Sequence, residues 1–175
     1  KFDGVNFKSY YTTDGIAENF ITASHKDENR NLWLGFNQGS VTMYDGKNFR
    51  SINTSGFTKS PVTSIINDDK GNIWCATQND GIFRISKNFE VSVYKIEFDK
   101  EIIYSIAFLG NNRLLVGTVN GIKLYELSPN DQKPKYISSI NCIPENHITS
   151  IVKKSNSGRF WVGTEEDGLF LLTPL

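Results

Sequence analysis

Residues 62–85 have the sequence VTSIINDDKGNIWCATQNDGIFRI, and the same pattern occurs four times along the chain. Each copy has a run of β-branched residues, a polar turn, a second apolar run with a bulky anchor, a loop with glycine and a third apolar run. The anchors of the four copies are Trp33, Trp74, Leu115 and Trp161. Short apolar runs separated by turn residues predict antiparallel strands.

A fourth run closes each of the first three copies, so a unit holds four strands in about 40 residues. These runs are FRSI at 49–52, FEVSVYKI at 89–96 and KYISSI at 135–140. No helical periodicity of useful length is present. Repeated units of this kind must stack on their neighbours to bury both faces. We therefore predict an all-β fold, a β-propeller of four blades with four antiparallel strands each.

The two ends of the chain leave two arrangements open. FDGVNFKSY at 2–10 aligns with YDGKNFRSI at 44–52, so residues 1–12 are predicted to be the outer strand of a preceding blade or of the last blade. The chain would then be a partial propeller, or a small ring that the first strand closes. The 175 residues are expected to form a single domain or fragment, with blades at 18–53, 60–97, 100–140 and 145–175, the last lacking its outer strand.

The composition argues against several classes of function. The 19 basic and 19 acidic side chains balance, so the sequence predicts neither a nucleic-acid partner nor a membrane-binding surface. The apolar runs are too short for a membrane-spanning helix. Cys75 and Cys142 provide neither a disulfide framework nor metal spacing. No nucleophile motif or phosphate-binding loop is present, so no cofactor and no catalytic residues are expected.

The repeat resembles the two-component regulator propeller family, whose pattern is D-x-x-G-N-(I/L)-W-(I/V)-G-T followed by a glycine loop and an apolar strand. Residues 62–85 are the nearest copy, and ITSIVKKSNSGRFWVGTEEDGLFLL at 148–172 is similar. The family is typical of the periplasmic sensor part of bacterial hybrid two-component regulators, where many members detect oligosaccharides and a histidine kinase follows. The resemblance implies a periplasmic, oligosaccharide-binding sensor segment without enzymatic activity, which signals by ligand-dependent rearrangement of a dimer.

The loops before the first strand and between the second and third strands share one face of a propeller, here called the loop face. Its amides and carboxylates offer donors and acceptors for sugar hydroxyls. The alternative is that Asn and Asp only set the turns. Tyr11 and Phe57 could stack on a sugar ring. The candidate ligand-binding residues there are Asn37, Gln38, Lys59, Asn79, Asp80, Asn120, His147, Glu166 and Asp167.

His25 is a further candidate because it takes a slot on the first strand that is apolar in the other copies. A His there needs a hydrogen bond, or belongs to a site near the central channel. The acidic run at 165–167 is a weak cation candidate, and we predict no metal site. Other residues are assigned structural roles: Trp33, Trp74 and Trp161 in packing between blades, and Gly39, Gly81, Gly121 and Gly168 in turns.

Two other functions stay open at this point. The first is a propeller lyase or hydrolase that uses His147, Glu166 and Asp167. The second is a scaffold for other proteins, which would expose a large apolar patch. The expected partners are an oligosaccharide and either further blades or a second copy of the chain, because an open stack exposes an apolar blade face at each end.

Overall fold

The fold is that of a computed structural model, which describes residues 4–94, 96, 101–110, 112–128, 134–140, 147–154 and 157–173. Within these residues it contains fifteen strands and one short 3-10 helix, Thr12–Asp14. The strands form four separate antiparallel sheets, each in chain order from its first strand to its last. The predicted all-β propeller architecture is confirmed.

Each sheet is one blade. Blade 1 contains β1 (Ile21–Lys26), β2 (Leu32–Phe36), β3 (Val41–Tyr44) and β4 (Phe49–Ile52). Blade 2 contains β5 (Val62–Asn67), β6 (Ile73–Thr77), β7 (Ile82–Ile85) and β8 (Val91–Tyr94). Blade 3 contains β9 (Ile103–Gly110), β10 (Arg113–Thr118), β11 (Gly121–Glu126) and β12 (Lys135–Ile140). Blade 4 contains β13 (Ile148–Lys153), β14 (Phe160–Thr164) and β15 (Leu169–Leu172), three strands in the described part of the chain.

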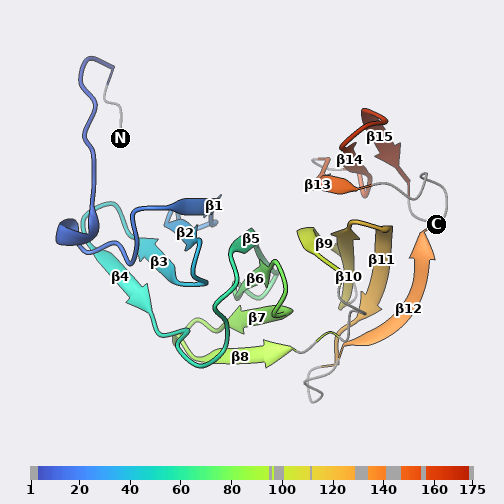
Figure 1. The fold of residues 1–175 in the computed structure, drawn as a ribbon, viewed down its shortest axis with the longest axis horizontal. Helices are drawn as coiled ribbons and strands as arrows, with labels where there is room; N and C mark the ends of the chain where they lie inside the picture. Colours follow the sequence, from blue (N-terminus) through green and yellow to red (C-terminus); the bar gives the residue numbers. More distant parts are fainter. Residues whose placement is uncertain are drawn as a thin grey trace.

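The blades follow one another around an arc, with their first strands on the inside (Figure 1). The inner strands of successive blades contact each other, β1 with β5, β5 with β9 and β9 with β13. The arc is open between blade 4 and blade 1 in Figure 1.

The core is divided among the interfaces between blades. Trp33 and Val41 of blade 1 pack on Val62, Ile65 and other side chains of blade 2. The same arrangement joins blade 2 to blade 3 and blade 3 to blade 4. Alternate side chains of a strand point to opposite faces of its sheet, so each middle strand supplies both neighbouring interfaces. This is why the apolar runs of the sequence are continuous and do not alternate with polar residues.

The N-terminal segment does not close the ring in this structure. Its described residues lie beside blade 1, far from β15 (Figure 1). The ring of Tyr10 packs edge-on against Phe49, with 5.1 Å between centroids, and against Tyr44 at 5.8 Å. No strand of the described chain precedes β1. Of the two arrangements left open by the sequence, the structure therefore has the partial propeller, and the three described strands of blade 4 agree with the prediction that this blade lacks its outer strand.

Candidate functional site

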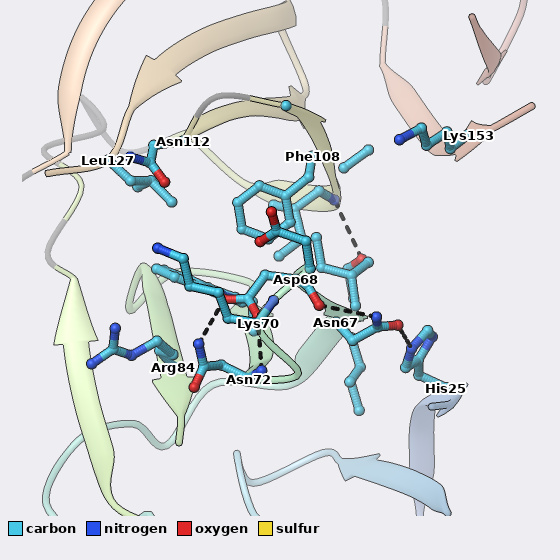
Figure 2. A pocket seen from close by; sticks show the side chains of 18 of the residues that line it. His25, Asn67, Asp68, Lys70, Asn72, Arg84, Phe108, Asn112, Leu127 and Lys153 are labelled. Atoms are coloured by element: carbon cyan, nitrogen blue, oxygen red, sulfur yellow. Dashed lines mark hydrogen bonds between the residues drawn. The ribbon is translucent and has the colours of Figure 1, made fainter. Parts of the chain in front are cut away.

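A cavity of about 1030 Å³ lies where the inner strands end and the turns to the second strands begin. All four blades line it, through His25 of β1, Asn67 of β5, Phe108 of β9 and Lys153 of β13. Figure 2 shows these side chains around the cavity, with the β5–β6 turn among them. This is the end of the blades opposite to the loop face, because it holds the turns between the first and second strands.

The β5–β6 turn is held by a single carboxylate. Asp68 accepts hydrogen bonds from Trp74 Nε1 at 2.9 Å, from Asn72 Nδ2 at 2.8 Å and from the Asn72 backbone N–H at 2.8 Å. The Lys70 backbone N–H donates a fourth, at 3.0 Å. Partial burial alone would raise the pKa of Asp68, but these hydrogen bonds together hold it below its ordinary value. The turn is therefore a fixed wall of the cavity, which we call the Asp68 clasp.

Blade 1 contains the same clasp. Asp27 accepts hydrogen bonds from Trp33 Nε1 at 2.9 Å and from Asn31 Nδ2 at 3.0 Å, and its pKa is likewise lowered by hydrogen bonding despite the opposing effect of burial. The pattern is D-x-x-x-N-x-W in both blades. The sequence pattern predicts the Trp residues as packing anchors and does not reveal this role of their indole N–H groups. The recurrence of Asp six residues before Trp in blades 1 and 2 was the available signal.

His25 lies in the cavity and its ring is hydrogen-bonded. Its Nε2 donates to Asn67 Oδ1 at 2.8 Å, which joins blade 1 to blade 2 (Figure 2). The Asn67 amide in turn donates to the Asp68 carbonyl at 3.2 Å. This chain of hydrogen bonds accounts for the polar side chain at an inner-strand slot that holds apolar residues in the other blades.

Arg84 supplies a cation on the side of the Asp68 clasp that faces away from His25 (Figure 2). Its guanidinium carbon lies 5.9 Å from the ring centroids of both Trp74 and Tyr94. Its Nε is buried and has no hydrogen-bond partner among the described residues. Lys70 and Lys153 also line the cavity, together with the carboxylates of Glu28 and Asp69. The site thus presents both hydrogen-bond donors and acceptors, next to the aromatic ring of Phe108.

On the loop face, the candidate residues Asp80 and Asn120 form hydrogen bonds to neighbouring loops. Asp80 accepts hydrogen bonds from the backbone N–H groups of Lys59 and Ser60, at 3.0 and 3.1 Å, and from the Thr58 hydroxyl at 3.0 Å. The Lys59 bond is the main cause of the lowered pKa of Asp80. Asn120 donates to Glu101 Oε1 at 3.1 Å.

The remaining loop-face candidates are mostly exposed. The Gln38 backbone N–H donates to Glu18 at 3.1 Å, and the Asn37 N–H donates to the Phe20 carbonyl at 3.1 Å. His147 forms an ion pair with Glu165. The side chains of Asn79, Glu166 and Asp167 are exposed, and no side-chain contact among the described residues gathers them into one site. Much of the loops at 97–101 and 142–147, and Cys142, lie outside the described residues.

The structural candidates occupy repeated positions. Trp33 and Trp74 are each 4% exposed at blade interfaces, whereas Trp161 of blade 4 is 38% exposed. The four glycines of the loops between second and third strands all have positive φ, a conformation that side chains disfavour: Gly39, Gly81, Gly121 and Gly168.

The described residues contain no group of three or more His, Cys, Asp or Glu side chains arranged for a metal ion. Cys75 is fully buried, and burial raises the pKa of its thiol far above the ordinary value. It is therefore a packing residue of blade 2.

The comparison with known families matches residues 56–79 to the family described as two component regulator propeller. This stretch therefore matches one two-component regulator propeller repeat. The matched residues of this repeat contain β5, the Asp68 clasp and β6. A comparison with curated proteins found no significant match.

Several solved structures share the fold of these repeats. The extracellular domain of the hybrid two-component system BT4673 from B. thetaiotaomicron is 21% identical, with a TM-score of 0.69 over 93% of this chain and 22% of that one. The chain thus spans less than a quarter of that domain. The computationally designed Ika4 protein is 15% identical, with a TM-score of 0.66 over 90% of this chain and 93% of its own.

An enzyme is also among the similar structures. Virginiamycin B lyase from Staphylococcus aureus is 12% identical, with a TM-score of 0.66 over 89% of this chain and 56% of the lyase. At these identities the likeness establishes the propeller fold alone. No helix in the described parts of the chain is long and apolar enough to span a membrane.

Proposed function

We propose that this chain is a ligand-binding segment of an extracellular or periplasmic two-component sensor, and that its ligand is an oligosaccharide bound in the cavity between the blades. The observation that supports this most is the cavity itself, which residues of all four blades line. Its volume of about 1030 Å³ lies at the upper end of ordinary ligand sites. The two-component regulator propeller repeat favours a sensor over an enzyme.

The chemistry of the lining supports a sugar ligand. Planar amides and carboxylates can each make several hydrogen bonds to hydroxyl groups, and Asn67, Asn112 and Asp69 are of this kind. Phe108 provides an apolar ring against which a sugar face can pack. The Asp68 clasp and the His25–Asn67 hydrogen bond hold this wall in place before a ligand arrives, which lowers the entropy cost of binding.

The position of the cavity suggests how binding would be transmitted. A ligand that contacts His25 of blade 1 and Lys153 of blade 4 would favour one spacing of the blades over others. An oligosaccharide with higher affinity for one spacing shifts the population toward it. In a sensor dimer, this shift would change how the two subunits are arranged, which is the proposed signal.

Isothermal titration calorimetry of the chain with xylo-, arabino-, galacto- and galacturono-oligosaccharides tests the proposal. We expect at least one of them to bind, and Asn67→Ala to weaken its binding at least about 10-fold, the loss of one or two hydrogen bonds in a partly buried site. Asn79→Ala, an exposed amide on the loop face, is the matched control and should leave the affinity unchanged. The absence of binding by every sugar, or an effect of Asn79→Ala larger than that of Asn67→Ala, would overturn it.

A further inference from the structure

Two of the three interfaces between blades contain the same hydrogen bond between their inner strands. The Ser64 hydroxyl of β5 accepts a hydrogen bond from the Ile106 N–H of β9 at 3.3 Å, and the Ser105 hydroxyl of β9 accepts one from the Ile151 N–H of β13 at 3.0 Å. The equivalent residue of β13 is Ser150. It is exposed, and its hydroxyl has no hydrogen-bond partner in the described part of the chain. Blade 4 therefore carries the acceptor that blades 2 and 3 use to hold the following blade.

The apolar part of this surface is also repeated in blade 4. Trp33 and Trp74 pack against the following blade and are 4% exposed, whereas Trp161 in the same position is 38% exposed. Val152 and Leu171 beside it are also exposed. We call Ser150, Val152, Trp161, Leu169 and Leu171 the tail face. It is a fourth copy of a surface that is buried three times within the chain.

Blade 1 carries the complementary surface. In blade 2, Val62 faces the preceding blade and is 0% exposed, but its equivalent in blade 1, Ile21, is 47% exposed. Leu32, the equivalent of buried Ile73, is exposed as well. Residues Tyr10–Ile16 cover the outer part of this side, through contacts of Tyr10 with Tyr44 and Phe49. We call Ile21, Ser24 and Leu32 the head face.

We propose that the tail face of one chain binds the head face of a second copy of the same chain. The apolar part of the tail face has three buried precedents in this fold, each against a surface of which the head face is another copy. In the docked pair, the Ser24 N–H takes the place of the Ile106 and Ile151 N–H groups, and donates to the Ser150 hydroxyl.

The same repetition predicts how the N-terminal segment of the second copy pairs with β15 of the first. In blade 1, Val41 pairs with Ile52 and Tyr44 with Phe49. Residues 2–10 align with 44–52, so Tyr10 of the second copy lies opposite Leu169, and Phe7 opposite Leu172. Residues 7–10 thereby take the place of a fourth strand in blade 4 of the neighbour. Two such contacts between two chains close a ring of eight blades, within the ordinary range for propellers.

Light scattering coupled to size exclusion, run on the 175-residue chain over a dilution series, tests the proposal. We expect a species of twice the 19.8 kDa chain mass. Trp161→Glu on the tail face and Ile21→Glu on the head face should each weaken association at least about 30-fold, the loss typical of a central aromatic or aliphatic anchor. Phe57→Glu, an exposed aromatic on the loop face, should leave the dimer intact.

Mixing the two variants tests the head-to-tail geometry. Each should be a monomer alone, because both contacts of a ring made from one variant contain the altered face. A mixture retains one intact pair of faces, the tail of Ile21→Glu against the head of Trp161→Glu, and should form a heterodimer. Far-ultraviolet circular dichroism shows whether both variants are folded, and Ser150→Ala, a smaller change, should weaken association in the same direction.

Three results would overturn the proposal. One is a wild-type chain that stays monomeric over the whole dilution series. Another is a dimer that Trp161→Glu and Ile21→Glu leave intact although both variants fold. The last is a mixture of the two variants that stays monomeric, since the one intact tail face and the one intact head face would then not bind each other. None of these results depends on whether the cavity binds a sugar.

Discussion

At the scale of single residues, the Asp–Asn–Trp clasp links blade packing to the cavity. The indole of Trp74 fills the interface with blade 3, and its N–H is held by Asp68, whose other hydrogen bonds shape the β5–β6 turn. The same side chains thus stabilise the fold and form a wall of the candidate site. In blade 4, the ring of Trp161 has a cation beside it, because Lys154 Nζ lies 5.4 Å from the ring centroid.

Removing the clasp carboxylate should destabilise the chain. Asp68→Ala leaves Trp74 Nε1 and both Asn72 donors without their acceptor, and we expect the free energy of unfolding to fall by about 2–3 kcal/mol. Urea unfolding followed by tryptophan fluorescence measures this. Asp69→Ala, at the neighbouring exposed position, should change stability by less than about 0.5 kcal/mol. Equal effects of the two substitutions would contradict the role given to the clasp.

The clasps also predict how stability depends on pH. Hydrogen bonds hold the pKa of Asp27 and of Asp68 below the ordinary value of 3.8 in the folded chain. A carboxylate with a depressed pKa stabilises the fold fully above its unfolded pKa, and this stability is lost as the pH falls through the folded pKa. We expect stability to decline below about pH 4.

Urea titrations at several pH values between 3 and 6 test this expectation. The Asp27→Asn/Asp68→Asn double variant should show a shallower decline on acidification, since it lacks two of the carboxylates responsible. A decline as steep as that of the wild type would assign the acid sensitivity to other groups.

At the scale of elements, the second strands come very close to the following blade. A Cβ atom added at Gly35 would lie 2.5 Å from Val62 Cγ1, and one at Gly117 would lie 2.6 Å from Ile148 Cγ2. Glycine at these positions is therefore required by the approach of two blades. At Gly163 of blade 4, an added Cβ would meet only the hydroxyl groups of Ser150 and Thr149 and the Ser150 Cβ at 3.9 Å.

This difference predicts unequal effects of one substitution. Gly35→Ala and Gly117→Ala should each lower the free energy of unfolding by about 1–3 kcal/mol, because the added methyl group forces the blades apart. Gly163→Ala should cost clearly less, since a serine hydroxyl can rotate away. Thermal or urea unfolding at concentrations too low for association provides the comparison. Equal losses at all three positions would show that strand geometry, and not the approach of blades, determines the cost.

The elements were also the part of the fold that the sequence predicted best. Apolar runs, anchors and loop glycines recur in the same order in every copy, and each run became a strand because a blade must bury both faces. The Asp–Asn–Trp clasp was missed, since hydrogen bonds of side chains have no periodicity. Of the candidate ligand residues, His25 lies in the cavity. Asp80 and Asn120 lie in loop contacts, and no pattern of sequence shows that such a side chain already has a partner.

At the scale of the whole molecule, the arc gives one cavity walls from four blades and leaves two apolar faces at its ends. The cavity supports a mode of ligand binding in which the bound ligand changes the spacing of the blades. The two apolar faces support the pairing of chains through the tail and head faces. Both follow from one repeated unit, because the side chains that face the ring centre and the side chains that face the next blade recur at fixed positions.

The measurement that tests the central claim most directly is the location of a bound oligosaccharide on the folded chain. Two-dimensional amide NMR spectra of the isotopically labelled chain, recorded during titration with the sugar that calorimetry identifies, give this location. We predict that the largest shifts occur at the amides of residues 67–72 and of Phe108 and Lys153, around the cavity. Shifts confined to the loop face, at residues 37–38, 78–80 and 165–167, would contradict the account.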